Sequence, residues 1–108
     1  LQMIKGWIDD EGETHEKVVD IACANDLTVD PVSGRCPSNG ARVDLKTCTF
    51  SHGSGATELK EVWHDPDYDS AQSAFYYVRA LMNPTCRWSS YDAIRLGREP
   101  DPRVPATI

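Results

Sequence analysis

The amino-acid sequence predicts a mostly β domain, built as an antiparallel sheet or sandwich, with one short helix near the C-terminus. Two observations carry this prediction. Several short segments alternate apolar and polar side chains, and clusters of Gly, Pro, Asn, Asp and Ser separate them. Only the stretch 87–97 near the C-terminus is expected to form a helix.

Residues 1–9 and 14–23 are expected to form a hairpin around the acidic, glycine-containing turn "DDEGE". Residues 24–40 are rich in turn formers and show no periodicity, which predicts a long loop that Cys36 could fasten. Residues 41–50 alternate again, which predicts a third strand.

Residues 57–64, "TELKEVWH", have helix-favouring residue types, but they are few and also suit alternation, so we expect a strand. Residues 74–82, "AFYYVRALM", are aromatic and β-branched for much of their length, which strongly favours a strand. In 87–97, Ser89 or Ser90 would cap the helix and Gly97 would end it. A proline-rich, extended tail follows.

Composition bounds the function classes. A chain of 108 residues fits one small domain, or a piece of a larger protein, spanning 1–108. Its net charge of −6 and the lack of basic clusters argue against nucleic-acid binding. No apolar segment approaches the ~20 residues that span a bilayer, so we expect no membrane partner.

The four cysteines are Cys23, Cys36, Cys48 and Cys86. None forms a C-x-x-C pair or a Cys/His cluster with zinc spacing, so a structural zinc is not expected. An even number of cysteines in a small domain favours disulfides over free thiols, and hence a periplasmic or secreted location. Four cysteines allow three pairings.

The stretch "HDPDYDSAQ" places Asp65, Asp67 and Asp69 at alternate positions, as many calcium loops do. An EF-hand loop would need glycine and glutamate where Ser70 and Tyr76 stand. Aspartate and proline are also good turn formers. We therefore keep the three aspartates as candidate metal ligands but predict a turn whose carboxylates accept backbone N–H bonds or face solvent.

Catalytic motifs are missing from the rest of the chain. His15 lacks the second histidine of a zinc-protease helix, and His52 does not lie in a hydrolase elbow motif. His64 adjoins the aspartates but is expected to do nothing chemical. Most aromatic residues are expected in the core, and a sugar-stacking platform is the less favoured alternative; its members would be Trp7, Trp63, Trp88, Tyr68, Tyr76, Tyr77 and Tyr91.

Parts of the sequence resemble two known families. The stretch "DSAQSAFYYVRAL" resembles the tyrosine-corner region of immunoglobulin-like and fibronectin type III domains, with Tyr76 or Tyr77 as the corner tyrosine that bonds to upstream backbone. More extensively, residues 3–23, 35–48, 55–97 and 104–108 resemble the C-terminal region of large bacterial proteins catalogued as domain of unknown function 3604.

The second resemblance implies a C-terminal fragment of a longer protein, whose N-terminal part resembles PHP-type metal-dependent phosphoesterases. No residue here matches that part's His-x-His motif, so no catalytic residue, metal or cofactor is expected in this fragment. The resemblance implies a non-catalytic accessory domain that contacts the N-terminal domain of its parent. The alternative is an independent carbohydrate- or calcium-binding module. A strand expected after "VPATI" is missing, so an open sheet edge could also form a homo-oligomer.

We predict the disulfides Cys23–Cys36 and Cys48–Cys86. The first would fasten the long loop to the end of the second strand. The second would connect the expected strand at 41–50 to the segment after "AFYYVRALM". With all four cysteines bonded, no thiol nucleophile remains.

Overall fold

The computed structural model describes residues 1–108, which divide into two compact units. The first unit comprises Leu1–Pro37 and Ala56–Leu81, and the second comprises Ser38–Gly55 and Met82–Ile108. Each unit contains one disulfide and its own buried residues. Regular structure is mostly strand, with one short helix near the C-terminus, as predicted.

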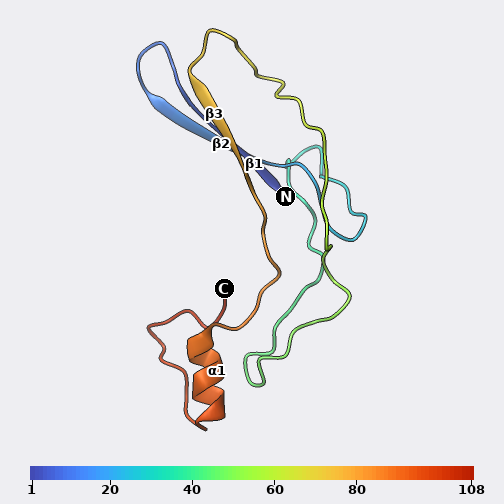
Figure 1. Ribbon diagram of the computed structural model, residues 1–108, viewed down its shortest axis with the longest axis vertical. Helices are drawn as coiled ribbons and strands as arrows, with labels where there is room; N and C mark the ends of the chain where they lie inside the picture. Colours follow the sequence, from blue (N-terminus) through green and yellow to red (C-terminus); the bar gives the residue numbers. More distant parts are fainter. The chain divides into compact units, whose positions relative to one another are not determined.

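The first unit is built on a three-stranded antiparallel sheet of β1 (Gln2–Ile8), β2 (Thr14–Asp20) and β3 (Ala74–Arg79). Figure 1 shows β1 in the centre, with β2 and β3 as the two edges. The predicted hairpin and the predicted aromatic strand are both confirmed. No second sheet is present, so the architecture is the single sheet rather than the sandwich.

The hairpin turn at residues 9–13 follows directly from its sequence. One carboxylate oxygen of Asp9 accepts the N–H groups of Glu11 and Glu13, which holds the turn closed. Gly12 has a φ of +86°, a left-handed conformation that glycine adopts without steric cost. The acidic, glycine-containing segment is therefore a well-determined connection between β1 and β2.

The pairing register assigns the strand residues to two faces, since side chains alternate along each strand. The face that contains Ile4, here called the Ile4 face, consists of Gln2, Ile4, Gly6, Ile8, Thr14, Glu16, Val18, Asp20, Phe75, Tyr77 and Arg79. The opposite one, the Lys5 face, consists of Met3, Lys5, Trp7, His15, Lys17, Val19, Ala74, Tyr76 and Val78.

Two predicted strands do not form. Residues 41–50 contain only an isolated bridge between Val43 and Phe50, because Asp44 closes a turn inside the segment. Its backbone carbonyl accepts the N–H of Cys48 at 2.7 Å, and its side chain accepts that of Lys46 at 2.8 Å. Cys48 then takes a φ of +56°, which no strand accommodates.

The segment 57–64 is irregular as well, so the expected strand there is wrong. Its charged residues Glu58, Lys60 and Glu61 leave few apolar side chains to bury, and Val62 is largely exposed. Alternation without an apolar partner surface is insufficient to form a strand.

In the second unit, α1 (Trp88–Arg95) confirms the predicted helix but corrects its cap. The N-cap residue is Arg87, which makes no side-chain capping bond, so neither Ser89 nor Ser90 is the cap. Ser90 is instead buried inside the helix, and its hydroxyl donates to the carbonyl of Ala106 at 2.9 Å. Gly97 follows the helix with a φ of +63° and ends it as expected.

Candidate functional site

The aspartate stretch lies against the Lys5 face of the sheet. Lys5 donates to a carboxylate oxygen of Asp65 at 2.7 Å, and the Tyr76 hydroxyl donates to the same oxygen at 2.7 Å. The side chains of Lys5 and Asp65 are only 5% and 6% exposed. Tyr76 therefore does not make the contact of a tyrosine corner, since its hydroxyl bonds an upstream side chain rather than upstream backbone.

The other two aspartates make different contacts. Asp67 forms an ion pair with Lys17 of β2, and its carbonyl accepts a second bond from Lys5 at 2.8 Å. Asp69 accepts the N–H of Ala71 at 2.8 Å, and Asp65 accepts that of Asp67 at 3.0 Å. The predicted turn bonds to backbone are confirmed at Asp65 and Asp69, whereas the two lysine ion pairs were not foreseen. No three His, Cys, Asp or Glu side chains gather at a possible metal position.

The lysine contact changes the acidity of the groups around it. Burial alone would raise the pKa of the Asp65 carboxyl, but hydrogen bonds from Lys5 and Tyr76 outweigh it and lower the pKa to about 2. The hydrogen bond that each group donates to Asp65 in turn raises the pKa of the Lys5 ammonium and that of the Tyr76 hydroxyl. The cluster is therefore a charged structural fastening between the sheet and the segment 65–67.

The three histidines lie in three different settings. The His15 ring stacks on Trp7 with centroids 5.2 Å apart, and its Nε2 lies 2.6 Å from an oxygen of Asp9. This hydrogen bond lowers the pKa of Asp9. His52 contacts the Phe50 ring in the second unit, and His64 is exposed.

Both predicted disulfides are present. Cys23–Cys36 closes the long loop of the first unit, and Cys48–Cys86 joins two distant segments of the second. All four cysteines are bonded, so no free thiol is available as a nucleophile. Two disulfides in a small chain are typical of an oxidising compartment.

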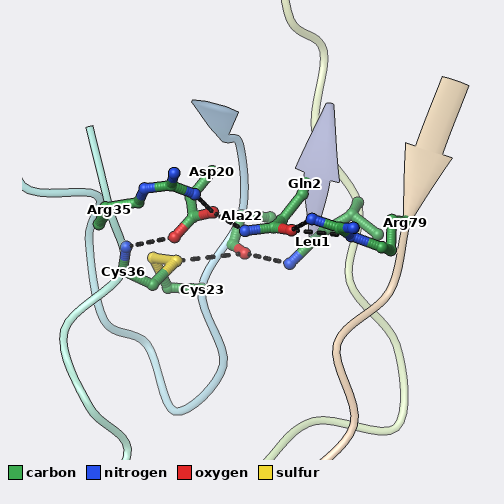
Figure 2. Close-up of polar contacts among 8 residues, drawn as sticks. All are labelled: Leu1, Gln2, Asp20, Ala22, Cys23, Arg35, Cys36 and Arg79. Atoms are coloured by element: carbon green, nitrogen blue, oxygen red, sulfur yellow. Dashed lines mark hydrogen bonds and ion pairs between the residues drawn. A yellow bond between two sulfur atoms is a disulfide. The ribbon is translucent and has the colours of Figure 1, made fainter. Parts of the chain in front are cut away.

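A row of polar side chains crosses all three strands at one end of the Ile4 face. Figure 2 shows Gln2 between Arg79 and Asp20, accepting from the arginine at 2.7 Å and donating to the aspartate at 2.7 Å. Asp20 also accepts the N–H of Cys36 at 2.7 Å. Burial alone would raise the pKa of Asp20, but the bonds from Cys36 and Gln2 hold it below its ordinary value. This row joins the disulfide-closed loop to the sheet.

Beyond that polar row, the Ile4 face carries several exposed apolar side chains. Ile4 itself is 1% exposed, but the neighbouring Phe75 and Tyr77 are 62% and 47% exposed. Their rings lie nearly parallel, with centroids 6.3 Å apart and planes 12° apart. Phe75 covers Gly6 so closely that a Cβ there would lie 2.4 Å from the ring. Glycine at this position therefore lets the phenylalanine ring pack closely against β1.

A mostly apolar pocket of about 550 Å³ opens beside Phe75. The residues that line it come from all three strands and from the residue before β3: Gly6, Trp7, Ile8, Thr14, His15, Glu16, Ser73, Ala74 and Phe75. Sequence reasoning missed this site, because it assigned most aromatic residues to the core. The signal that could have found it is the register, which places a glycine beside Phe75 on a face rich in apolar residues.

The aromatic residues do not form one platform. They lie in separate ring pairs, which include Phe75–Tyr77 and Trp63–Tyr76 in the first unit and Trp88–Tyr91 in the second.

The helix α1 is not long and apolar enough to cross a membrane.

Comparison with known proteins gives one assignment. Residues 1–108 match the family described as "Protein of unknown function (DUF3604)". No curated protein and no solved structure matches the chain significantly.

Proposed function

We propose that this chain, which belongs to the DUF3604 family of proteins of unknown function, is a non-catalytic accessory domain. In this proposal the Ile4 face docks on another domain of the parent protein and stabilises it. That partner is an N-terminal PHP-like metal-dependent hydrolase domain, as the sequence resemblance implies. The two disulfides support a periplasmic or secreted parent.

One observation carries the proposal: the Ile4 face holds exposed apolar side chains beside an apolar pocket. The segment 65–67 covers the middle of the Lys5 face and is fastened there by the buried pair of Lys5 and Asp65. On the Ile4 face, Phe75, Tyr77 and Ile8 are about half exposed or more, beside an apolar pocket. A sheet gains stability by burying one apolar face against another element, and an exposed apolar patch marks an interaction site.

The docking can be tested by replacing aromatic side chains of the Ile4 face. Phe75→Ser combined with Tyr77→Ser should weaken binding of this chain to the separately produced N-terminal domain at least about tenfold. Val78→Ser is the matched control, because Val78 is similarly exposed on the same strand but belongs to the Lys5 face. Calorimetric titration measures both, and equal binding by the two variants would contradict docking through the Ile4 face.

The proposal also states that the isolated chain has no hydrolase activity. Hydrolysis requires a metal-activated water or a nucleophile beside a base, and the disulfides leave no free thiol. Purified chain should therefore give no metal-dependent turnover of generic phosphoesters or sulfoesters. Turnover that His52→Ala or His64→Ala abolished would show that the chain is itself an enzyme.

A carbohydrate-binding module is the second candidate, and the parallel rings of Phe75 and Tyr77 favour it. Exposed, nearly parallel rings beside a pocket offer apolar faces on which a sugar can stack. Titration with a panel of oligosaccharides distinguishes the two functions. Saturable binding that Phe75→Ser removes, without binding to the N-terminal domain, would favour the module.

Calcium binding is the remaining variant of that module, and the lysine partners of Asp65 and Asp67 argue against it. Their ammonium groups occupy the carboxylates that a cation would need. A ligand that binds only the folded state raises the melting temperature. We therefore expect the melting temperature to stay the same when calcium is added.

A further inference from the structure

The outer edge of β3 has unpaired backbone groups. Ile8 donates to the carbonyl of Ser73, so the odd-numbered residues of β3 direct their backbone bonds toward β1. The groups of Ala74, Tyr76 and Val78 therefore point away from the sheet. No other segment of the chain pairs with them, and all six residues of β3 are exposed.

Nothing in β3 protects this edge from pairing. Proteins commonly block an exposed edge strand with lysine, proline or a bulge. Residues 74–79 contain neither lysine nor proline, and their only charged side chain, Arg79, is bonded to Gln2. The opposite edge differs, because β2 carries Glu16 and Lys17 at its centre. Of the two edges, β3 is the one suited to receive another strand.

We propose that β3 pairs with β3 of a second copy of this chain, antiparallel about a twofold axis at Tyr76. In this register Tyr76 lies opposite its own copy and Ala74 opposite Val78, so that the outward backbone groups of both strands are satisfied. The inference goes beyond the proposed accessory function, because it rests on the outward backbone groups of β3, although Phe75 and Tyr77 belong to both surfaces.

The side chains of β3 are self-complementary in this register. Phe75 of each copy lies opposite Tyr77 of the other, which gives two aromatic cross-strand pairs, among the favourable pairings in antiparallel sheets. Arg79 lies opposite Ser73, so no like charges meet. A second copy is therefore a fitting occupant of the edge, and the paired β3 strands join two three-stranded sheets into one.

The register can be tested with two matched double variants of exposed residues. Ala74→Lys with Val78→Lys places like charges opposite each other twice, whereas Ala74→Lys with Val78→Glu places opposite charges there. Sedimentation equilibrium should show a concentration-dependent dimer for the unchanged chain and for the Lys/Glu variant. For the Lys/Lys variant the dissociation constant should rise at least about tenfold. Circular dichroism checks that both variants fold.

Amide hydrogen exchange on the unchanged chain gives a test that requires no variant. Exchange at Tyr76 and Val78 should slow as protein concentration rises, while exchange at Phe75, which faces β1, should stay constant. A chain that stays monomeric at every concentration would overturn the inference. So would equal dimerisation of the two double variants, or loss of the dimer in both.

Discussion

The contact between Lys5 and Asp65 explains how a lysine can occupy the central strand of a small sheet. The ammonium donates to the Asp65 carboxylate and to the carbonyl of Asp67, so its charge is satisfied although the side chain is buried. Because side chains alternate along a strand, Lys5 lies on the face opposite that of Ile4. The sequence could not reveal the partner, because 60 residues separate Lys5 from Asp65 and the segment between them is largely irregular.

We predict that Asp65→Asn lowers the melting temperature by several degrees at neutral pH, since it leaves the buried ammonium without a counter-charge. The folded-state pKa of Asp65, about 2, lies below its ordinary 3.8. The pair's stabilisation is therefore complete above 3.8 and is lost as the pH falls through about 2. Thermal melts across this acidic range should fall more steeply for the unchanged chain than for the variant.

Asp67→Asn is the matched control for this prediction. The Lys17–Asp67 pair is solvent-exposed, and exposed pairs contribute little to stability. The melting temperature of the Asp67→Asn variant should stay close to that of the unchanged chain. If the two substitutions lowered the melting temperature equally, the burial of Asp65 would have no effect on stability.

The sequence predicts a strand correctly where the partner strand is adjacent in the chain, or where the residue types strongly favour a strand. The hairpin of β1 and β2 has its partner across a short turn, and β3 has an aromatic, β-branched composition. The segments 41–50 and 57–64 also alternate, but the turn at Asp44 and the charges of 58–61 prevent pairing. The exposed apolar side chains of the Ile4 face were not predicted, because alternation does not tell which face another element will cover.

Helix α1 also shows that a sequence pattern does not reveal which contacts a residue makes. Ser90 lies within the helix and not at its cap, and its buried hydroxyl donates to the carbonyl of Ala106. We predict that Ser90→Ala lowers the free energy of unfolding by about 1 kcal/mol, because a buried hydrogen bond is lost. Chemical denaturation measures this change.

Ser89→Ala provides the comparison, since Ser89 is exposed and caps nothing. Its effect should stay within about 0.5 kcal/mol. If Ser89→Ala proved the more harmful of the two, the helix would begin at a serine cap after all.

The two units depend on their disulfides to different degrees. The first has a three-stranded ladder and the buried Ile4. In the second, the buried apolar residues are Cys48, Cys86 and Ala93, so the disulfide is itself most of the core. Its regular structure is limited to α1 and two isolated bridges, one of which joins Cys86 to Thr107. A core this small is rarely stable without a cross-link.

We therefore predict that replacing Cys48 and Cys86 with alanine unfolds the second unit while the sheet remains. The lost bridge spans 38 residues and contributes about 4 kcal/mol in the chain-entropy model. Replacing Cys23 and Cys36, which span 13 residues, should cost about 3 kcal/mol and leave the strand ladder in place. Hydrogen exchange should show rapid exchange throughout α1 in the first variant, with protected amides in β1. Loss of protection in β1 to the same extent as in α1 would mean that the units unfold together and that neither disulfide acts locally.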